Sequence, residues 1–436
     1  MGDTPAASGT GRSPGLPPVI TCREPGSFAR GVMAERHPAL IEQVREAFPY
    51  GPRQLRALDA LLHEIAHGVV EPLDHGCPDR DLWLRWGREH VGRPWFEAPF
   101  LWSESYFYRR LLGAVGYFGE GAWRGIDPFA PFKRAELGGG TVEEELRALD
   151  DLVAVPAAER ATALLRASLW GNRADLGFRG PTAEGGPAEE AKPTSDSGPP
   201  GEGGPAGGTA PGESDAGVVV DDSALLWSLL PPGAHATVAV VADNTGRELI
   251  PDLVLIDHLL EHGQADRVVL HVKPGPYYVS DAMTADVVDC VRRLGRAPGE
   301  AGAIGGRIRE AMGAGRLDVR AHAFFCAPFP YERMPDDLRA ELGSAALTIL
   351  KGDLNYRRLV GDRRWPGTAS FEALTAYFPG AVAALRTLKS DVVVGLDTRT
   401  LDGLERSGRA WRTSGTHALI QVRPRESALS TPPRTG

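Results

Sequence analysis

Ala-Thr-Val-Ala-Val-Val-Ala-Asp-Asn-Thr-Gly-Arg-Glu-Leu, residues 236–249, contains three local patterns in succession. Seven apolar or β-branched residues run without alternation into Asp243 and Asn244, Thr245 and Gly246 follow, and apolar residues then recur at helical spacing. This order predicts a buried parallel strand, a tight turn and an amphipathic helix. Ligands in open α/β sheets collect beyond the carboxyl ends of the strands, where Asp243 and Asn244 are placed. Two oxygen-bearing side chains without a preceding G-x-G-x-x-G favour a hard cation over a dinucleotide.

The composition of the chain limits which classes of protein it can belong to. With 436 residues the chain can bury a large core and is expected to form two structural regions. Its 48 Lys and Arg against 57 Asp and Glu give a net charge of −9 without any basic block, which argues against a nucleic-acid surface. The four cysteines form no C-x-x-C pair, which argues against a disulfide framework or a thiolate zinc site and fits a reducing compartment.

The sequence shows no targeting or membrane segment. Residues 1–18 lack the charged start and apolar core of a signal peptide. No stretch is apolar for long enough to span a bilayer. We therefore expect a soluble cytoplasmic protein with no membrane partner.

Changes in composition divide the chain into five segments. Residues 177–217 are rich in Gly, Pro, Ala, Glu, Ser and Thr and cannot bury enough apolar surface to offset the entropy of ordering, so a disordered insertion is expected. Disordered tails are expected at 1–20 and 425–436. The insertion separates a helical N-terminal region, 21–176, from an α/β domain, 218–424.

Helical spacing of apolar residues predicts helices over 27–48 and 53–70. The second contains His63-Glu64-Ile65-Ala66-His67, whose two histidines would share one helix face and could hold zinc, with Glu64 as general base. A zinc protease also needs a third ligand, which this chain lacks at the usual spacing. We therefore interpret the two histidines as polar-face residues of a packed helix.

The segment 95–112 is rich in aromatic residues, most of which are expected in the core. Glu104 stands among them as a carboxylate that could serve a ligand. Further helices are predicted over 142–152 and 157–170, and the second leads to Gly171-Asn172. A Gly-Asn pair after an apolar helix is typical of a C-cap, and Asn172 could alternatively face a ligand.

Apolar runs separated by helical patterns continue through the second half of the chain. After the first strand, strands are predicted at 267–273, 317–325, 345–350, 383–389 and 417–422. This alternation indicates a parallel or mixed sheet covered on both faces, so the expected fold is α/β, a Rossmann-like three-layer α/β/α sheet. The polar residues beyond these strands are Asp281, then Asp353, Asn355 and Arg357, then Arg386, Thr387 and Lys389.

The side chains expected at this sheet edge suit a phosphorylated ligand. Asp243, Asn244 and Asp281 would give three oxygen ligands to Mg²⁺ or Mn²⁺, which take their remaining bonds from waters and a substrate phosphate. Arg357 and Lys389 would neutralise phosphate charge. Each residue also has an ordinary structural interpretation, because an Asp or Asn after a strand is often a helix N-cap and Lys or Arg is commonly solvated. Spacing alone leaves both interpretations open.

The motifs at these strand ends also carry a resemblance. They are Val241-Ala242-Asp243-Asn244-Thr245-Gly246-Arg247-Glu248-Leu249, Val279-Ser280-Asp281, Lys351-Gly352-Asp353-Leu354-Asn355-Tyr356-Arg357 with Gly361-Asp362-Arg363, and Leu385-Arg386-Thr387-Leu388-Lys389. Together they resemble the damage-control phosphatase family, a former domain of unknown function. The Arg-Thr-x-Lys element points to the subfamily named after the acidic residue methyltransferase. Further matches at 27–29, 106–110 and 168–172 extend the resemblance over nearly the whole chain apart from the tails and the insertion.

The resemblance implies a metal-dependent phosphatase that hydrolyses sugar phosphates such as fructose 1-phosphate, or related damaged phosphometabolites, with cobalt, nickel, manganese or magnesium in its site. The implied metal ligands are Asp243, Asn244 and Asp281. Asp243 or Asp353 could orient the attacking water or accept its proton. The substrate-binding residues are expected to be Glu104, Asn172, Asp353, Leu354, Asn355, Tyr356, Arg357 and Lys389.

Two alternatives belong to other classes of function. The same subfamily has also been described as an S-adenosylmethionine-dependent protein-glutamate O-methyltransferase. The missing Gly-rich loop after the first strand argues against that activity, because an adenosyl cofactor ordinarily needs close backbone approach there. A sugar-phosphate-binding regulator is the non-enzymatic alternative, and no DNA-binding or partner module is evident in the sequence.

Overall fold

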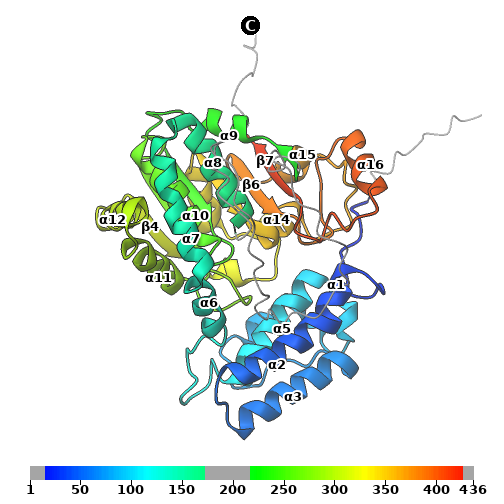
Figure 1. The fold of residues 1–436 in the computed structure, drawn as a ribbon. Coiled ribbons are helices and arrows are strands. Elements are labelled where there is room, and N and C mark those ends of the chain that lie inside the picture. Colours follow the sequence, from blue (N-terminus) through cyan, green and yellow to red (C-terminus); the bar gives the residue numbers. More distant parts are fainter. Residues whose placement is uncertain (1–14, 172–216, 426–436) are drawn as a thin grey trace, which may run out of the picture.

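A computed structural model describes residues 15–171 and 217–425 (Figure 1). A seven-stranded sheet lies at the centre with helices against both faces, and a group of N-terminal helices extends to one side of it (Figure 1). The expected α/β class, with a layered sheet and a helical N-terminal region, is confirmed. Nearly all of the predicted insertion and most of both predicted tails fall outside the described residues.

The sheet consists of β1 (Val218–Asp221), β2 (Thr237–Val241), β3 (Arg267–Val272), β4 (Leu317–Ala321), β5 (Leu347–Lys351), β6 (Val382–Thr387) and β7 (Ala418–Arg423). Their order in space is β1-β7-β6-β5-β2-β3-β4. Neighbours are parallel except β6 and β7, which pair antiparallel, so the sheet is mixed. β2 therefore lies between β5 and β3 inside the parallel part.

Two strand predictions differ from the structure. The sequence does not predict β1, because its run of three valines is shorter than the window in which a strand pattern shows. The predicted strand 317–325 is wrong in its second half and ends at Ala321. There, His322 Nδ1 accepts the backbone N–H of Phe324 at 3.0 Å and caps a 3₁₀-helix, Ala323–Cys326, which stops the strand.

Alternate residues of β2 enter two hydrophobic cores, one on each face of the sheet. Val238 and Val240 face the first core, whereas Ala239 and Val241 face the second. The helical elements of the first core are α7 (Gly140–Ala148), η4 (Leu149–Ala154), α8 (Ala157–Trp170), α9 (Ser223–Leu229), α10 (Leu249–Glu261), α11 (Thr284–Gly295) and α12 (Gly299–Gly313).

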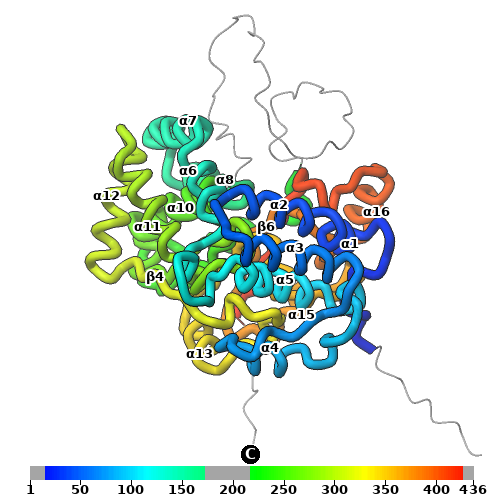
Figure 2. Tube along the Cα trace, turned by 90° about the horizontal axis from the view of Figure 1, so that it is seen from below, coloured from blue at the N-terminus to red at the C-terminus, as the bar shows by residue number. Residues whose placement is uncertain are grey.

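The second core joins the N-terminal helices to the sheet. Its central element is α5 (Phe100–Val115), which is apolar or aromatic around most of its circumference and is buried along nearly its whole length. Figure 2 shows α2, α3 and α5 side by side in the view from below. The other helical elements on this side are α1 (Phe28–Gly31), the π-helix η1 (Val32–Arg36), α2 (His37–Ala47), α3 (Pro52–His67), α4 (Arg80–Gly87), η2 (Arg88–His90), η3 (Trp95–Glu97), α6 (Ala130–Leu137), η8 (Tyr331–Arg333), α13 (Asp336–Ser344), α14 (Gly352–Val360), α15 (Phe371–Thr375) and α16 (Thr398–Arg406).

The H-E-x-x-H sequence lies on α3 and serves packing. Glu64 accepts hydrogen bonds from Arg110 (Nη2, 2.7 Å) and from Trp95 (Nε1, 3.1 Å), which ties α3 to α5. His63 and His67 are both exposed. The carboxylate that a zinc protease would use as a base is therefore held by a guanidinium, as the polar-face interpretation expects. In the part of the chain that the structure describes, no helix has the length and apolar character needed to cross a bilayer.

His37 makes the N-terminal helices sensitive to acid. Its ring stacks on Phe107 with centroids 3.7 Å apart, its exposed fraction is 1%, and neither ring nitrogen has a hydrogen-bond partner among the described residues. Burial first, and Arg36 second, lower the pKa of His37 from 6.5 to about 3. The unfolded chain thus binds this proton near neutrality, whereas the folded chain excludes it down to strongly acid pH.

We expect the free energy of unfolding to fall as the pH drops from about 6.5 towards 3, and His37→Phe to remove up to about 1.4 kcal/mol per pH unit of that slope. Denaturant unfolding at several pH values between 7 and 5 measures the slope. His75→Phe, at an exposed position, is the matched control and should keep the wild-type slope. An unchanged slope in His37→Phe would contradict a buried neutral imidazole.

Candidate functional site

Two strand-end loops meet at the carboxyl edge of β2 and β3. The Thr245 N–H donates to the Ser280 carbonyl at 2.8 Å, and the Ala282 N–H donates to the Asp243 carbonyl at 2.9 Å. Asn244 and Asp281 form an isolated antiparallel bridge between these hydrogen bonds. The structure thus brings together the three residues that the sequence analysis proposes as metal ligands, and it does so through the backbone.

The side chains of Asn244 and Asp281 are both held by the loop after β3. Asn244 Oδ1 accepts a hydrogen bond from Ser280 Oγ at 2.7 Å, and Asp281 Oδ2 accepts one from the Tyr278 N–H at 2.9 Å. Behind the loop, Lys133 Nζ donates to the Asp281 carbonyl at 2.8 Å. Asp281 is 1% exposed, so its carboxylate is fixed in place before any ligand arrives.

Asp243 is a buried carboxylate pressed against a glycine. Its exposed fraction is 8%. Gly352, the first residue of α14, has φ +82°, and a Cβ there would lie 1.8 Å from Asp243 Oδ2. Burial, followed by the charges of Glu248 and Asp281, raises the pKa of Asp243 well above its usual value. Burial and the two neighbouring carboxylates thus disfavour the ionised form of Asp243, although Lys273 and Lys389 favour it.

This donor set fits a hard divalent cation. Two carboxylates and an amide oxygen, from Asp243, Asp281 and Asn244, are the ligand types that Mg²⁺ or Mn²⁺ prefers. Across residues 15–171 and 217–425, no three His, Cys, Asp or Glu side chains gather as a metal cluster. A cation held here would thus rely on waters and substrate oxygens for its remaining bonds, which is the usual arrangement for Mg²⁺.

Lys273 is a site residue that the sequence analysis misses. It lies just beyond β3, it is 2% exposed, and its ammonium group is 3.6 Å from Asp281 Oδ1. Its Nζ has no hydrogen-bond partner among the described residues. Lys273 thus has an ion-pair partner in Asp281 but keeps a buried donor without a hydrogen bond, which an anionic ligand could accept. The available signal was a charge placed directly at the end of an apolar strand.

Asp353 lies in the first turn of α14, and hydrogen bonds from β6 and the segment after it fix its carboxylate. Its Oδ1 accepts hydrogen bonds from Arg386 Nε at 2.8 Å and Ser390 Oγ at 3.0 Å. Burial would raise the pKa of Asp353, but the charges of Arg386 and Arg357 outweigh it and hold that pKa below its usual value. Arg386 is fully buried and also donates to the Val392 carbonyl. Asp353 is thus a firmly ionised carboxylate that fixes the loop after β6.

The side chains of Asn355 and Tyr356 are occupied by protein partners. Asn355 Nδ2 donates to the carbonyls of Lys351 at 2.8 Å and Ala242 at 3.2 Å, so it fastens α14 to the end of β2. The Tyr356 hydroxyl donates to Gln421 Oε1 at 2.9 Å. Both residues have an exposed fraction of 0%. In this arrangement the two side chains hold α14 in place against the strands.

Arg357 and Glu104 form one buried ion pair, and Leu354 packs near them. Arg357 Nη1 donates to Glu104 Oε2 at 3.0 Å, and its Nε donates to Asp362 Oδ1 at 2.9 Å. Glu104 also accepts from the Tyr278 hydroxyl at 3.0 Å, in the loop that carries Asp281. Burial raises the pKa of Glu104 despite the neighbouring Arg357. Leu354 belongs to a small apolar cluster completed by Leu101 and Tyr277.

Lys389 is the accessible cation at the opening of the site. Its side chain is 45% exposed and its Nζ lies 3.2 Å from Glu248 Oε1. Glu248, which the sequence analysis does not select, is also close to Gly171, where a Cβ would lie 2.5 Å from its Cγ. Burial lowers the pKa of Lys389, but the charges of Glu248 and Asp243 outweigh it and raise it. Asn172 lies outside the described residues.

Sequence comparisons with known proteins agree on one family. The family model described as the damage-control phosphatase ARMT1-like domain matches residues 32–403. Damage-control phosphatase ARMT1 of Danio rerio is 30% identical over 457 residues, covering 93% of this chain and 97% of the relative. The Rattus norvegicus protein of the same name is 29% identical over 454 residues, covering 93% of this chain and 98% of the relative. The crystal structure of a DUF89 family protein from Pyrococcus horikoshii matches 90% of this chain and 96% of that chain, with 14% identity and a TM-score of 0.43.

The matched residues 32–403 include every strand-end motif described above. They also include the N-terminal helices from η1 onward that share the second core with the sheet. The chain is therefore a phosphatase and belongs to the damage-control phosphatase ARMT1-like domain family.

Proposed function

We propose that this chain is a divalent-metal-dependent phosphatase that hydrolyses sugar phosphates of the fructose 1-phosphate type or related damaged phosphometabolites. The observation that carries the proposal is the convergence of Asp243, Asn244 and Asp281 beside the ammonium of Lys273, which makes no hydrogen bond to the described residues. A small phosphorylated metabolite would bring its phosphate to this group of charges. The four free thiols of the chain support work in a reducing compartment such as the cytoplasm.

Asp243, Asn244 and Asp281 would hold the cation, which supplies Lewis-acid stabilisation and lowers the pKa of bound water. Lys351, the N-cap residue of α14, makes no side-chain capping hydrogen bond, so the backbone N–H groups of the first turn would donate to phosphate oxygens. Lys273 and Lys389 would bind the oxygens on which negative charge develops during in-line displacement. Asp243 Oδ2 can accept the proton of the attacking water. The phosphorus–oxygen bond to the sugar breaks on the opposite side, the departing sugar oxygen takes up a proton from solvent water, and the sugar leaves as an alcohol.

The experiment that tests this proposal is phosphate release from a panel of sugar phosphates by metal-stripped protein, with Mg²⁺, Mn²⁺, Co²⁺ or Ni²⁺ restored in turn. We expect release to require an added cation. Incubation with S-adenosylmethionine and the protein's own carboxylates provides the comparison with methyl transfer. Release that is equally fast in the stripped protein would refute metal dependence. Methyl transfer without phosphate release would refute the proposal itself.

Lys389→Ala should lower kcat/KM by roughly ten- to a hundredfold, since one charge-assisted contact to phosphate is lost. Steady-state kinetics on the best substrate measure the change. Lys389→Arg keeps the charge and should recover part of the activity. The exposed Arg309→Gln on α12 is the control and should leave kcat/KM unchanged. An unaltered kcat/KM in Lys389→Ala would remove this lysine from the site.

A further inference from the structure

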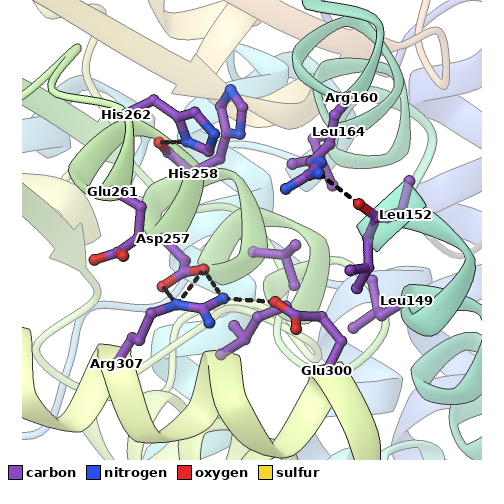
Figure 3. A pocket seen from close by; sticks show the side chains of 13 residues that line it. Leu149, Leu152, Arg160, Leu164, Asp257, His258, Glu261, His262, Glu300 and Arg307 are labelled. Atoms are coloured by element: carbon purple, nitrogen blue, oxygen red, sulfur yellow. Dashed lines mark hydrogen bonds and ion pairs between the residues drawn. The ribbon is translucent and has the colours of Figure 1, made fainter. Parts of the chain in front are cut away.

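A cavity of 170 Å³ lies between η4, α8, α10 and α12, on the first-core face of the sheet (Figure 3). It is separate from the strand-end site. α10 begins at Leu249, next to that site, whereas its cavity-lining residues run from Val254 to the end of the helix. Asp257 is eight residues beyond Leu249, which corresponds to about 12 Å along the helix axis.

One side of the cavity carries polar groups that lack partners. Arg160 Nη2 donates to the carbonyls of Val153 and Val155, each at 3.0 Å, but its buried Nε has no hydrogen-bond partner among the described residues. His258 is 4% exposed, and its buried Nδ1 likewise has no hydrogen-bond partner among the described residues. Figure 3 shows the Arg160 guanidinium extending from α8 towards the ring of His258 on α10. Two potential donors therefore converge on this cavity from neighbouring helices.

His258 lies beside His262, and burial keeps its ring uncharged near neutral pH. Its ring stacks on that of His262 with centroids 4.1 Å apart, and His262 Nδ1 donates to the His258 carbonyl at 2.9 Å. Burial first, then His262 and Arg160, lower the pKa of His258 to about 4. The neutral ring of His258 can therefore donate a hydrogen bond through Nδ1, and Arg160 supplies the positive charge on this side of the cavity.

Two carboxylates on the other side of the cavity share one guanidinium. Arg307 Nη2 donates to Asp257 Oδ2 at 2.7 Å and to Glu300 Oε1 at 2.8 Å (Figure 3). The exposed Glu261 points away from the two histidines (Figure 3). Between the two polar sides, the walls are apolar and consist of Leu149, Leu152, Leu164, Val254 and Ile304.

We propose that this cavity binds a small organic carboxylate, with the charged group between Arg160 and His258 and an apolar body against the leucine and valine walls. The Nε–H of Arg160 can donate a charge-assisted hydrogen bond to a carboxylate, and an unpartnered buried donor favours any ligand that satisfies it. The size agrees, because an apolar cavity of about 150 Å³ accommodates a benzene-sized molecule. The proposal is independent of the phosphatase mechanism.

Isothermal titration calorimetry with benzoate and isovalerate, compared with benzamide and isovaleramide, tests this site. We expect saturable binding of the carboxylates and at least tenfold weaker binding of the uncharged amides. Arg160→Gln should weaken carboxylate binding at least tenfold, whereas Arg309→Gln, an exposed change on α12 outside the cavity, should leave it unchanged. Equal binding of acids and amides, or no saturable binding of either acid, would overturn the proposal.

Two further variants keep the test decisive. Arg160 also holds two backbone carbonyls, so Arg160→Gln could unfold η4; His258→Phe keeps the ring and its packing, removes the donor, and should weaken binding at least threefold. Lys389→Ala should bind the carboxylates like the wild type. Loss of binding in Lys389→Ala, with retention in His258→Phe, would place the carboxylate at the strand-end site and refute the cavity assignment.

Discussion

Asp243→Asn is expected to lower kcat by roughly a hundred- to a thousandfold while the protein stays folded. The change removes a carboxylate that is 8% exposed and lies beside Asp281 and Gly352, and it preserves the shape of the side chain. Only Asp281 would then remain as a charged ligand of the proposed cation. Phosphate release at saturating metal and substrate measures the loss, and circular dichroism establishes that the fold is retained.

The same variant should increase the free energy of unfolding of the metal-free protein. Burial and the charges of Glu248 and Asp281 raise the pKa of Asp243, so its ionised form destabilises the fold at neutral pH and a neutral isostere relieves that cost. Added Mn²⁺ should stabilise the wild type more than the variant. The exposed Asp402→Asn on α16 is the matched control for both measurements. Near-normal kcat in Asp243→Asn would refute the metal assignment.

Gly352→Ala should abolish most of the activity although it adds a single methyl group. At φ +82° an L-residue costs about 1–2 kcal/mol. In addition, the new Cβ would lie 1.8 Å from Asp243 Oδ2, so either Asp243 or the start of α14 must move by more than an ångström. A displacement of about 1 Å at a reacting group can reduce turnover about a hundredfold. We therefore expect a loss of kcat of at least that size.

Gly315→Ala is the control that distinguishes the energetic cost of a positive φ from the steric clash with Asp243. Gly315 has φ +71°, and a Cβ there would meet nothing within 4 Å. Thermal unfolding should show a similar backbone penalty in both variants, with an additional loss only in Gly352→Ala. Phosphatase activity should be normal in Gly315→Ala. If Gly352→Ala were no less active than Gly315→Ala, the contact between Gly352 and Asp243 would have no role in the site.

The charged residues of the site show how much of its geometry could be predicted from the sequence. The sequence analysis selects Arg357 as a phosphate contact, yet the structure places its guanidinium between Glu104 and Asp362. Lys273 was not selected, yet its ammonium is the buried cation without a hydrogen-bond partner beside Asp281 among the described residues. Both residues follow or border a strand end, so their one-dimensional patterns do not separate them. The difference arises from which carboxylates the neighbouring helices bring within reach.

The sequence alone determined the α/β class, the central buried strand and the edge of the sheet at which Asp243, Asn244 and Asp281 lie, because these features follow from local periodicity and from the direction of parallel strands. The short edge strand β1 and the 3₁₀-helix after β4 depended on tertiary pairing and on a side-chain cap.

Only the tertiary structure decided which polar groups already have partners within the protein. Lys351 is an example of a charge that already has partners, since its ammonium pairs with Asp252 and donates to Ser168 on the first-core face. Hydrogen bonds and ion pairs between segments more than a hundred residues apart have no signature in local sequence, so the division between structural and ligand-facing charges is a property of the assembled fold.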